Sequence, residues 1–339
     1  MSINTGDKLK IWFADMWLHF EFDNNYFYHL LNTEYEVELN EEEPDILFVS
    51  ADPMGWQERK KYAHLTSAKR VFYTMESCGP NLTEATYPPR VKIETIRRTF
   101  DKHTMDKKII EYQSAGAGYR DYYYDKCDFY LGYSANGSIN QQFPFWAYGI
   151  DWLNKESYGM PDFLWKTSDL ETNEYKTTSK TKFCSMFFNL GLSNRYEIYD
   201  KLNLYKTTDG YGEPFCNSFY PWEKGKLGHS KDYKFQVCFE NDVIDHYHTE
   251  KIPLAKYAGN IPIYWGASTA SQYFNPDCYL NLIDFESIDA LVERMKEIDQ
   301  NDSLYQQYAS APLFTEAQNP NNLYSPEIIL NFFKNKVLA

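Results

Sequence analysis

The stretch FENDVIDHYHTEKI, residues 239–252, sets histidines, acids and a lysine between two apolar runs. His246 and His248 form an H-x-H pair, and on an extended segment alternate residues share a face, where two imidazoles could bind one zinc or iron ion. The acids close to this pair are Asp242, Asp245 and Glu250. Two ligands do not make a site and no third is identified by its spacing, so the pattern favours no metal.

A nucleotide site uses more of the same stretch, because it follows a strand-like run and precedes a helix that Thr249 can cap. A helix N-terminus offers unpaired N–H groups and the positive end of a dipole, which suit a diphosphate. Lys251 opposes that dipole unless an anion lies between them, and Glu250 could accept hydrogen bonds from a ribose. A solvated lysine and a first-turn acid explain both residues equally well, so the alternatives stay open on physical grounds.

The first half of the chain is predicted to alternate between strands and helices. Apolar runs bounded by polar residues predict buried parallel strands. We expect strands at 9–15, 44–52, 69–77 and 127–133, and a helix after the first strand through Leu30. Residues 82–126 have poor periodicity and are interpreted as an insertion, with one helix near Met105 to Tyr112.

The second half repeats the alternation after a polar segment. Strands are predicted at 182–188, 233–241 and 261–266, and helices at 193–203, 249–259, 287–298 and 327–338. Ser193 or Asn194 is the expected cap of the first of these helices. Two such halves predict an α/β protein with two doubly wound sheets and a cleft between them, where ligands bind beyond the carboxyl ends of strands.

Composition limits the function. The 339 residues carry a net charge of −14, which disfavours binding to nucleic acid, and 18% are aromatic, which suits stacking on sugars or bases. The six cysteines lack CxxC spacing, so reduced thiols are expected. No apolar run is long enough for a signal peptide or a membrane span, which predicts a cytoplasmic protein.

Four motifs occur in order: FEN at 239–241, Tyr-x-Thr-Glu-Lys at 247–251, IPIYWGAS at 261–268 and CYLNLIDF at 278–285. They resemble the donor-binding half of the α1,3/α1,4-fucosyltransferases of glycosyltransferase family 10, most closely the bacterial enzymes that build Lewis-type antigens. The resemblance covers about 182–308, and KRVFYTMESCGPN at 69–81 adds a shorter match.

The resemblance implies GDP-fucose as the donor. Arg195 and Lys251 fall on the family's phosphate-binding residues, and Glu250 falls on its ribose-binding glutamate. The other donor-binding positions predicted are Asn241, Tyr247, Thr249 and Gly266. At the last of these, the missing side chain would let the backbone approach the ligand.

Glu76 is the implied catalytic base, because it lies where the family has the Glu of its YTGEN segment. Met75 replaces the Gly and Ser77 the Asn of that segment in this chain. His246 and His248 are not part of the family pattern, and we interpret them as spacer positions of a loop.

The fold implied is GT-B, with two facing Rossmann-like domains. The predicted boundaries are an acceptor-binding domain at 1–155, a linker at 156–180, a donor-binding domain at 181–325 and a terminal helix at 326–339.

The activity implied is inverting transfer of L-fucose to the 3-OH, or the 4-OH, of an N-acetylglucosamine or glucose unit. Acceptors such as N-acetyllactosamine would lead to Lewis-type structures in surface polysaccharide. No cofactor is required, a divalent cation is at most stimulatory, and the expected partners are GDP-fucose and an oligosaccharide, with peripheral contact to the inner face of the membrane left open. The alternatives are a GT-B transferase for another nucleotide sugar and a non-catalytic glycan-binding protein.

Overall fold

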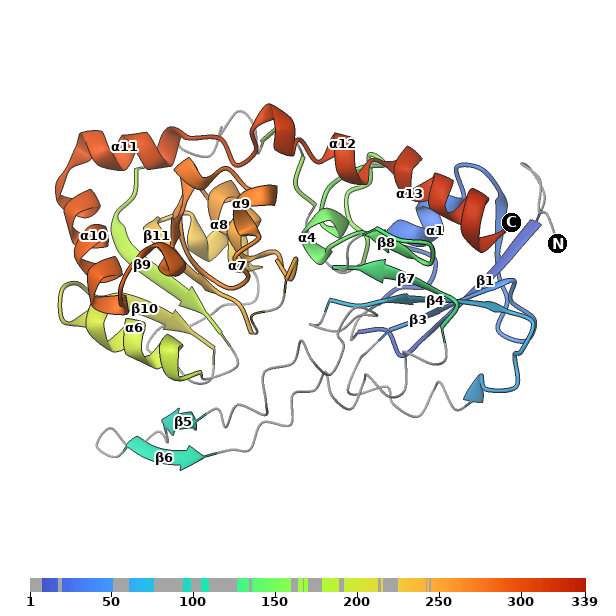
Figure 1. Cartoon of the computed structure of the whole chain (residues 1–339), viewed down its shortest axis with the longest axis horizontal. Coiled ribbons are helices and arrows are strands. Elements are labelled where there is room, and N and C mark those ends of the chain that lie inside the picture. Colours follow the sequence, from blue (N-terminus) through green and yellow to red (C-terminus); the bar gives the residue numbers. More distant parts are fainter. Residues whose placement is uncertain are drawn as a thin grey trace.

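A computed structural model of the chain shows two parallel sheets, each flanked by helices (Figure 1). It describes residues 8–17, 20–50, 61–75, 127–133, 136–159, 164–166, 168–169, 179–188, 192–212, 215, 225–241, 243 and 245–339, with the backbone of 94–98 and 105–109.

The first sheet has six parallel strands. In spatial order they are β2 (Glu36–Leu39), β1 (Lys8–Ala14), β3 (Ile46–Val49), β4 (Lys69–Tyr73), β7 (Phe129–Gly132) and β8 (Asn140–Gln142). All four residues of β3 are buried, as a central strand covered on both faces requires. Among the described residues, helices that follow its strands include α1 (Tyr26–Leu31) and α4 (Phe145–Tyr148).

The second sheet has five parallel strands. Their order is β10 (Thr208–Tyr211), β9 (Lys182–Phe187), β11 (Tyr233–Phe239), β12 (Ile261–Trp265) and β13 (Leu280–Asn281). The α-helices of this half are α6 (Ser193–Asn203), α7 (Gly225–Ser230), α8 (Lys251–Tyr257), α9 (Ala270–Tyr273), α10 (Ile288–Gln300) and α11 (Asp302–Ser310). Single turns of 3₁₀-helix lie at η4 (Pro276–Cys278), η5 (Leu282–Asp284) and η6 (Glu316–Gln318).

Several predicted elements are wrong or were not foreseen. The helix expected near Met105 is a strand, β6 (Met105–Ile109), which pairs antiparallel with β5 (Glu94–Arg98). The helix expected directly after β1 begins only at Tyr26, where the side chain of Asn25 caps it. The strands β2, β8 and β10 were missed because they are short and lack a continuous apolar run.

The chain returns to the first sheet at its end. Helices α12 (Asn321–Tyr324) and α13 (Pro326–Phe332) lead into a π-helical turn, η7 (Phe333–Val337), and α13 lies beside α1 (Figure 1). Phe333 is fully buried and packs against Phe27 and Phe48 of the first sheet's core. The last helices therefore complete the core of the first half, although they follow the second half in sequence.

Trp146 of α4 makes apolar contacts between the halves. It is buried and packs against Phe274 and Phe314, which follow β12, and against Tyr324 of α12. Within the part of the chain that the structure describes, no helix is both long and apolar enough to cross a bilayer.

Candidate active site

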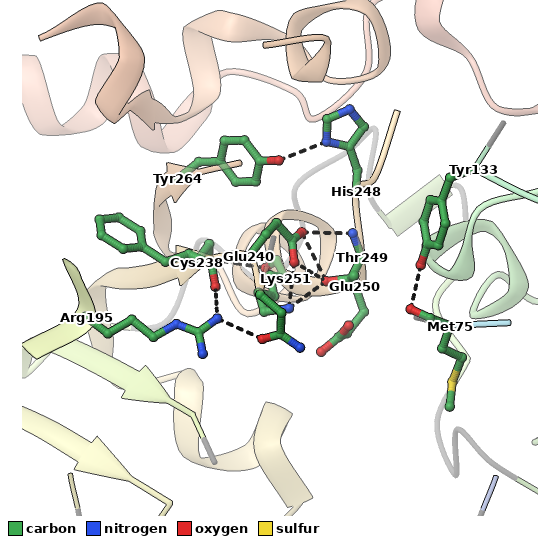
Figure 2. A network of polar contacts seen from close by, with 12 residues as sticks. Met75, Tyr133, Arg195, Cys238, Glu240, His248, Thr249, Glu250, Lys251 and Tyr264 are labelled. Atoms are coloured by element: carbon green, nitrogen blue, oxygen red, sulfur yellow. Dashed lines mark hydrogen bonds and ion pairs between the residues drawn. The ribbon is translucent and has the colours of Figure 1, made fainter. Parts of the chain in front are cut away.

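The predicted donor residues gather at the carboxyl ends of two neighbouring parallel strands. Glu240 and Asn241 directly follow β11, and Gly266 directly follows β12. The segment from Asp245 to Glu250 leads from this edge into α8 (Figure 2). This is the edge where open α/β sheets bind their ligands.

Glu240 holds this edge together. One carboxylate oxygen accepts from the backbone N–H of Thr249 at 2.9 Å, and the other accepts from the Nζ of Lys251 at 2.7 Å. The hydroxyl of Thr249 lies within 3.0 Å of both oxygens and 2.8 Å from Nζ. The Glu240 side chain is 1% exposed and that of Lys251 11%, so their ion pair is shielded from water.

One expectation about this segment is wrong, and the position of Lys251 has an explanation that was not foreseen. Thr249 does not cap α8, because its hydroxyl and N–H both contact Glu240; the residue before the helix is Glu250, which makes no side-chain capping bond. The unfavourable position of Lys251 in the first turn requires no bound anion, because Glu240 supplies the negative charge. Burial would lower the pKa of Lys251, but Glu240 and Glu250 outweigh it and raise that pKa.

Glu250 forms a second ion pair beside the first. Its carboxylate lies 3.1 Å from the Nζ of Lys226 in α7, and its side chain is 28% exposed. Burial acts to raise the pKa of Glu250, but the cations Lys226 and Lys251 outweigh it and lower the pKa to about 2. Glu250 is thus a carboxylate at neutral pH, suited to accept hydrogen bonds from hydroxyl groups.

Arg195 reaches this edge from α6. Its Nη2 donates to the carbonyl of Phe239 at 2.6 Å and to Oδ1 of Asn241 at 2.9 Å, and the guanidinium lies 3.9 Å from the centroid of Phe188. Arg195 is 1% exposed, so in this arrangement it orients Asn241. The helix matches its predicted bounds, but Leu192 rather than Ser193 or Asn194 occupies the N-cap position.

Tyr247 and Gly266 occupy buried positions at the site. Tyr247 is 1% exposed and its ring packs on Tyr133 of the first half, with centroids 4.7 Å apart. A Cβ at Gly266 would lie 2.2 Å from the Tyr264 hydroxyl and 2.9 Å from Cγ of Glu240. A glycine is thus needed there whatever the ligand.

The H-x-H pair is bonded to neighbouring side chains. His248 is buried, with Nδ1 at 2.9 Å from the Tyr264 hydroxyl and Nε2 at 3.0 Å from that of Thr269. Nδ1 of His246 lies 2.7 Å from the hydroxyl of Tyr273. Among the described residues, no group of three or more His, Cys, Asp or Glu is arranged to hold a metal ion.

Glu76, the predicted base, lies outside the described residues. The described chain reaches Met75, whose carbonyl accepts from the Tyr133 hydroxyl at 2.9 Å (Figure 2). Through Tyr133 the end of this strand segment is tied to Tyr247 and so to the candidate donor site.

The contacts of Glu240, Lys226 and Tyr133 at this site were not predicted from the sequence. Glu240 stands in the FEN motif, and a carboxylate directly after a strand that ends in three apolar residues is a signal that it has a buried partner. Lys226 and Tyr133 are distant in sequence from their partners, and nothing in the local pattern indicates those contacts.

Together, Arg195, Lys226 and Lys251 bring three cations to one strand edge, against the carboxylates of Glu240 and Glu250. The net charge of these five groups is one positive, although the whole chain is strongly acidic. Such a local excess suits an anionic ligand.

Comparison with solved structures defines the class of fold. A crystal structure of an alpha1,3-fucosyltransferase superposes with a TM-score of 0.67 and 23% identity, covering 98% of this chain and 91% of that chain. A crystal structure of an alpha1,3-fucosyltransferase with GDP-fucose superposes with a TM-score of 0.63 and 23% identity, covering 99% of this chain and 92% of that chain. The chain therefore has a GT-B-type fold.

Sequence comparison finds a match to one family. Residues 173–312 match the model described as "Glycosyltransferase family 10 (fucosyltransferase) C-term". The alpha-(1,3)-fucosyltransferase FucT of Helicobacter pylori is 27% identical over 316 residues, which are 90% of this chain and 60% of that protein.

A mammalian relative matches a shorter region. The 4-galactosyl-N-acetylglucosaminide 3-alpha-L-fucosyltransferase 9 of Mus musculus is 31% identical over 116 residues, 34% of this chain and 32% of that protein. The chain thus spans about 60% of the length of the Helicobacter relative and about a third of the mouse one.

Proposed function

We propose that this chain is an inverting fucosyltransferase that uses GDP-fucose as its donor. The observation that carries the proposal is the cluster of Arg195, Glu250 and Lys251 at one edge of the second sheet, in a region that matches the family 10 model. The acceptor position is the 3-OH, or the 4-OH, of an N-acetylglucosamine or glucose unit. The names of the relatives from Helicobacter and mouse support the 3-linkage.

The proposed reaction has one displacement step. The acceptor hydroxyl gives its proton to Glu76, its oxygen bonds to the anomeric carbon of fucose, and the bond from that carbon to the phosphate oxygen breaks. GDP leaves with the electron pair of that bond, and the anomeric configuration inverts because attack comes from the opposite face.

The protein cations stabilise the charge of the departing diphosphate. Lys251 is positioned for this role by Glu240, and each oriented charge acts more strongly in a partly buried site than in water. A net positive cluster can perform this task with no metal, so we include metal independence in the proposal.

Glu250 is proposed to bind the ribose hydroxyls, because its low pKa keeps it a hydrogen-bond acceptor at neutral pH. Cys184 and Cys238 are buried free thiols, which is typical of proteins in a reducing compartment. They support the cytoplasmic location that forms part of the proposal.

The test is a transfer assay with the purified chain. GDP-fucose, GDP-mannose and UDP-galactose are each offered with N-acetyllactosamine, its β1,3-linked isomer and lactose, and product linkage and anomeric configuration are determined by NMR. We expect turnover with GDP-fucose alone, retained in EDTA. Turnover with another donor would establish the rival transferase, and glycan binding without turnover of any donor would establish a lectin-like protein.

A further inference from the structure

The segment from Asp245 to Glu250, called here the donor loop, is linked to the first half of the molecule through His246 and Tyr247. Nδ1 of His246 lies 2.7 Å from the hydroxyl of Tyr273, at the end of α9. That hydroxyl in turn accepts from Nε2 of Gln142 in β8 at 2.8 Å. Three side chains thus link the donor loop to the edge strand of the other sheet.

The directions of these hydrogen bonds follow from the groups involved. The Gln142 amide nitrogen can only donate, while its oxygen accepts from the Tyr324 hydroxyl at 3.2 Å. Since the oxygen of Tyr273 accepts from Gln142, its single proton is available to Nδ1 of His246. In this arrangement Nδ1 of His246 is the acceptor, which corresponds to the tautomer with its proton on Nε2.

A second path, through Tyr133, also connects Gln142 to the donor loop, so that the two paths form a closed ring of contacts. Gln142 also donates to the carbonyl of Tyr133 at 3.0 Å, and the Tyr133 ring packs against Tyr247, the neighbour of His246. The Tyr133 hydroxyl holds the Met75 carbonyl. The ring therefore connects two successive donor-loop residues with the carboxyl end of the β4 segment.

The backbone fixes the direction in which His246 points. Its φ is +67°, a left-handed conformation that is uncommon for residues other than Gly, although Asn, Asp and His adopt it more often than the rest, and its N–H donates to the Thr269 hydroxyl at 2.9 Å. A strained conformation of this kind persists only where surrounding contacts require it. With the side chain held in this direction, Nδ1 of His246 meets the Tyr273 hydroxyl.

We propose that His246 is a positioning residue that fixes the donor loop against the first half through Tyr273 and Gln142. This inference rests on the proposed function, because the loop must bring the donor's anomeric carbon into line with an acceptor held by the other half. Misplacement of reacting groups by about 1 Å costs on the order of a hundredfold in rate. His246 needs no contact with the donor to have this effect.

Two substitutions separate the backbone from the hydrogen bond. His246→Asn keeps tolerance of positive φ and places Oδ1 at the same distance from Cβ as Nδ1, so it can still accept from Tyr273. His246→Gly also tolerates that φ but removes the acceptor. Tyr273→Phe removes the link from the other side, and His64→Gly at an exposed histidine is the control.

We expect His246→Gly and Tyr273→Phe to lower kcat for fucose transfer about tenfold or more, while the Kd for GDP stays within about twofold. His246→Asn and His64→Gly should transfer at nearly the parent rate. A parent rate in His246→Gly would overturn the inference. A variant that also binds GDP about tenfold more weakly and melts at a lower temperature would overturn it too, because that result would show a role in folding alone.

Amide hydrogen exchange gives a readout that does not depend on activity. Exchange in the donor loop and in β8 should accelerate in His246→Gly and remain unchanged in His246→Asn. If the parent chain transfers no sugar, the proposed function fails, and this measurement still decides whether His246 links the halves. Unchanged exchange in the glycine variant would contradict the link.

Discussion

At the scale of single residues, the ammonium group of Lys251 is paired with the Glu240 carboxylate and is largely shielded from solvent. A buried lysine without such a partner would lose its proton or destabilise the fold. The carboxylate therefore keeps the lysine charged and fixed, while the neighbouring Lys226 and Arg195 supply further positive charge. The family resemblance identified Lys251, but only the structure shows what keeps it in place.

Replacing Lys251 by Ala should weaken GDP binding. Loss of a charge-assisted contact with phosphate costs about 1.5 to 3 kcal/mol, which raises Kd by roughly 10- to 150-fold. Isothermal titration of GDP measures the change, with Lys296→Ala on the outer face of α10 as the control. Because the variant leaves Glu240 without its cation, its melting curve must first show that it is folded. Unchanged affinity in folded protein would remove Lys251 from the donor site.

Glu76 remains a prediction from resemblance. Glu76→Gln preserves shape but cannot accept the acceptor's proton, so turnover should fall by about 10² or more while GDP binding stays near that of the parent. Asp15, buried at the end of β1, is the alternative base, and Asp15→Asn is assayed in parallel. A glutamine variant that transfers fucose at the parent rate would assign the base elsewhere.

His248 should make the protein sensitive to acid. Burial, with a smaller effect of His246, lowers the pKa of His248 to about 3. Below pH 6.5 the unfolded chain binds a proton that the folded chain does not, so stability present above pH 6.5 is lost as pH falls toward 3. The free energy of unfolding should decline by up to about 1.4 kcal/mol per pH unit from this group.

Denaturant titrations at pH 7, 6 and 5 measure that decline. His248→Gln carries no titrating ring, so the difference between parent and variant should shrink as pH falls. A constant difference across this range would show that His248 titrates alike in the folded and unfolded chains.

At the scale of elements, the local sequence pattern correctly predicted the helices and strands whose formation depends mainly on their own residues. The bounds of α6 at 193–203 were predicted correctly, and the apolar runs gave the strands β9, β11 and β12 to within about two residues. Helix α8 starts two residues later than expected, because Thr249 is held by Glu240 across the loop. The strand β6 was mistaken for a helix because its pairing with β5 is not visible in its own sequence.

Gly266 joins β12 to the candidate site, and its lack of a side chain is required there. In Gly266→Ala, the new Cβ would meet the Tyr264 hydroxyl at 2.2 Å and Glu240 at 2.9 Å, so these side chains must move. Overpacking of this kind costs about 1 to 3 kcal/mol of stability. Thermal denaturation tests it against Gly137→Ala, where the nearest atom would be 3.7 Å away. Equal melting temperatures for the two variants would contradict the prediction.

At the scale of the whole molecule, strand alternation predicted two Rossmann-like halves, and the GT-B class was predicted correctly. The sequence did not indicate where the terminal helix would pack. The pattern EIILNFFKNKVL shows an amphipathic helix, but an apolar face alone does not identify its partner. The structure shows α13 and η7 crossing back to the first sheet, where Lys334 pairs with Glu34 at 2.6 Å.

The last helices should therefore stabilise the first half and not the second, which precedes them in sequence. Phe333 is fully buried against Phe27 and Phe48, so Phe333→Ala should leave a cavity and cost about 3 to 5 kcal/mol of unfolding free energy. Leu204→Ala, at a side chain that is 88% exposed, should change it by no more than about 0.5 kcal/mol. Hydrogen exchange in the phenylalanine variant should rise in β1 and β3 and stay at the parent level in β11. Loss of protection confined to β11 would contradict the prediction that the last helices stabilise the first half.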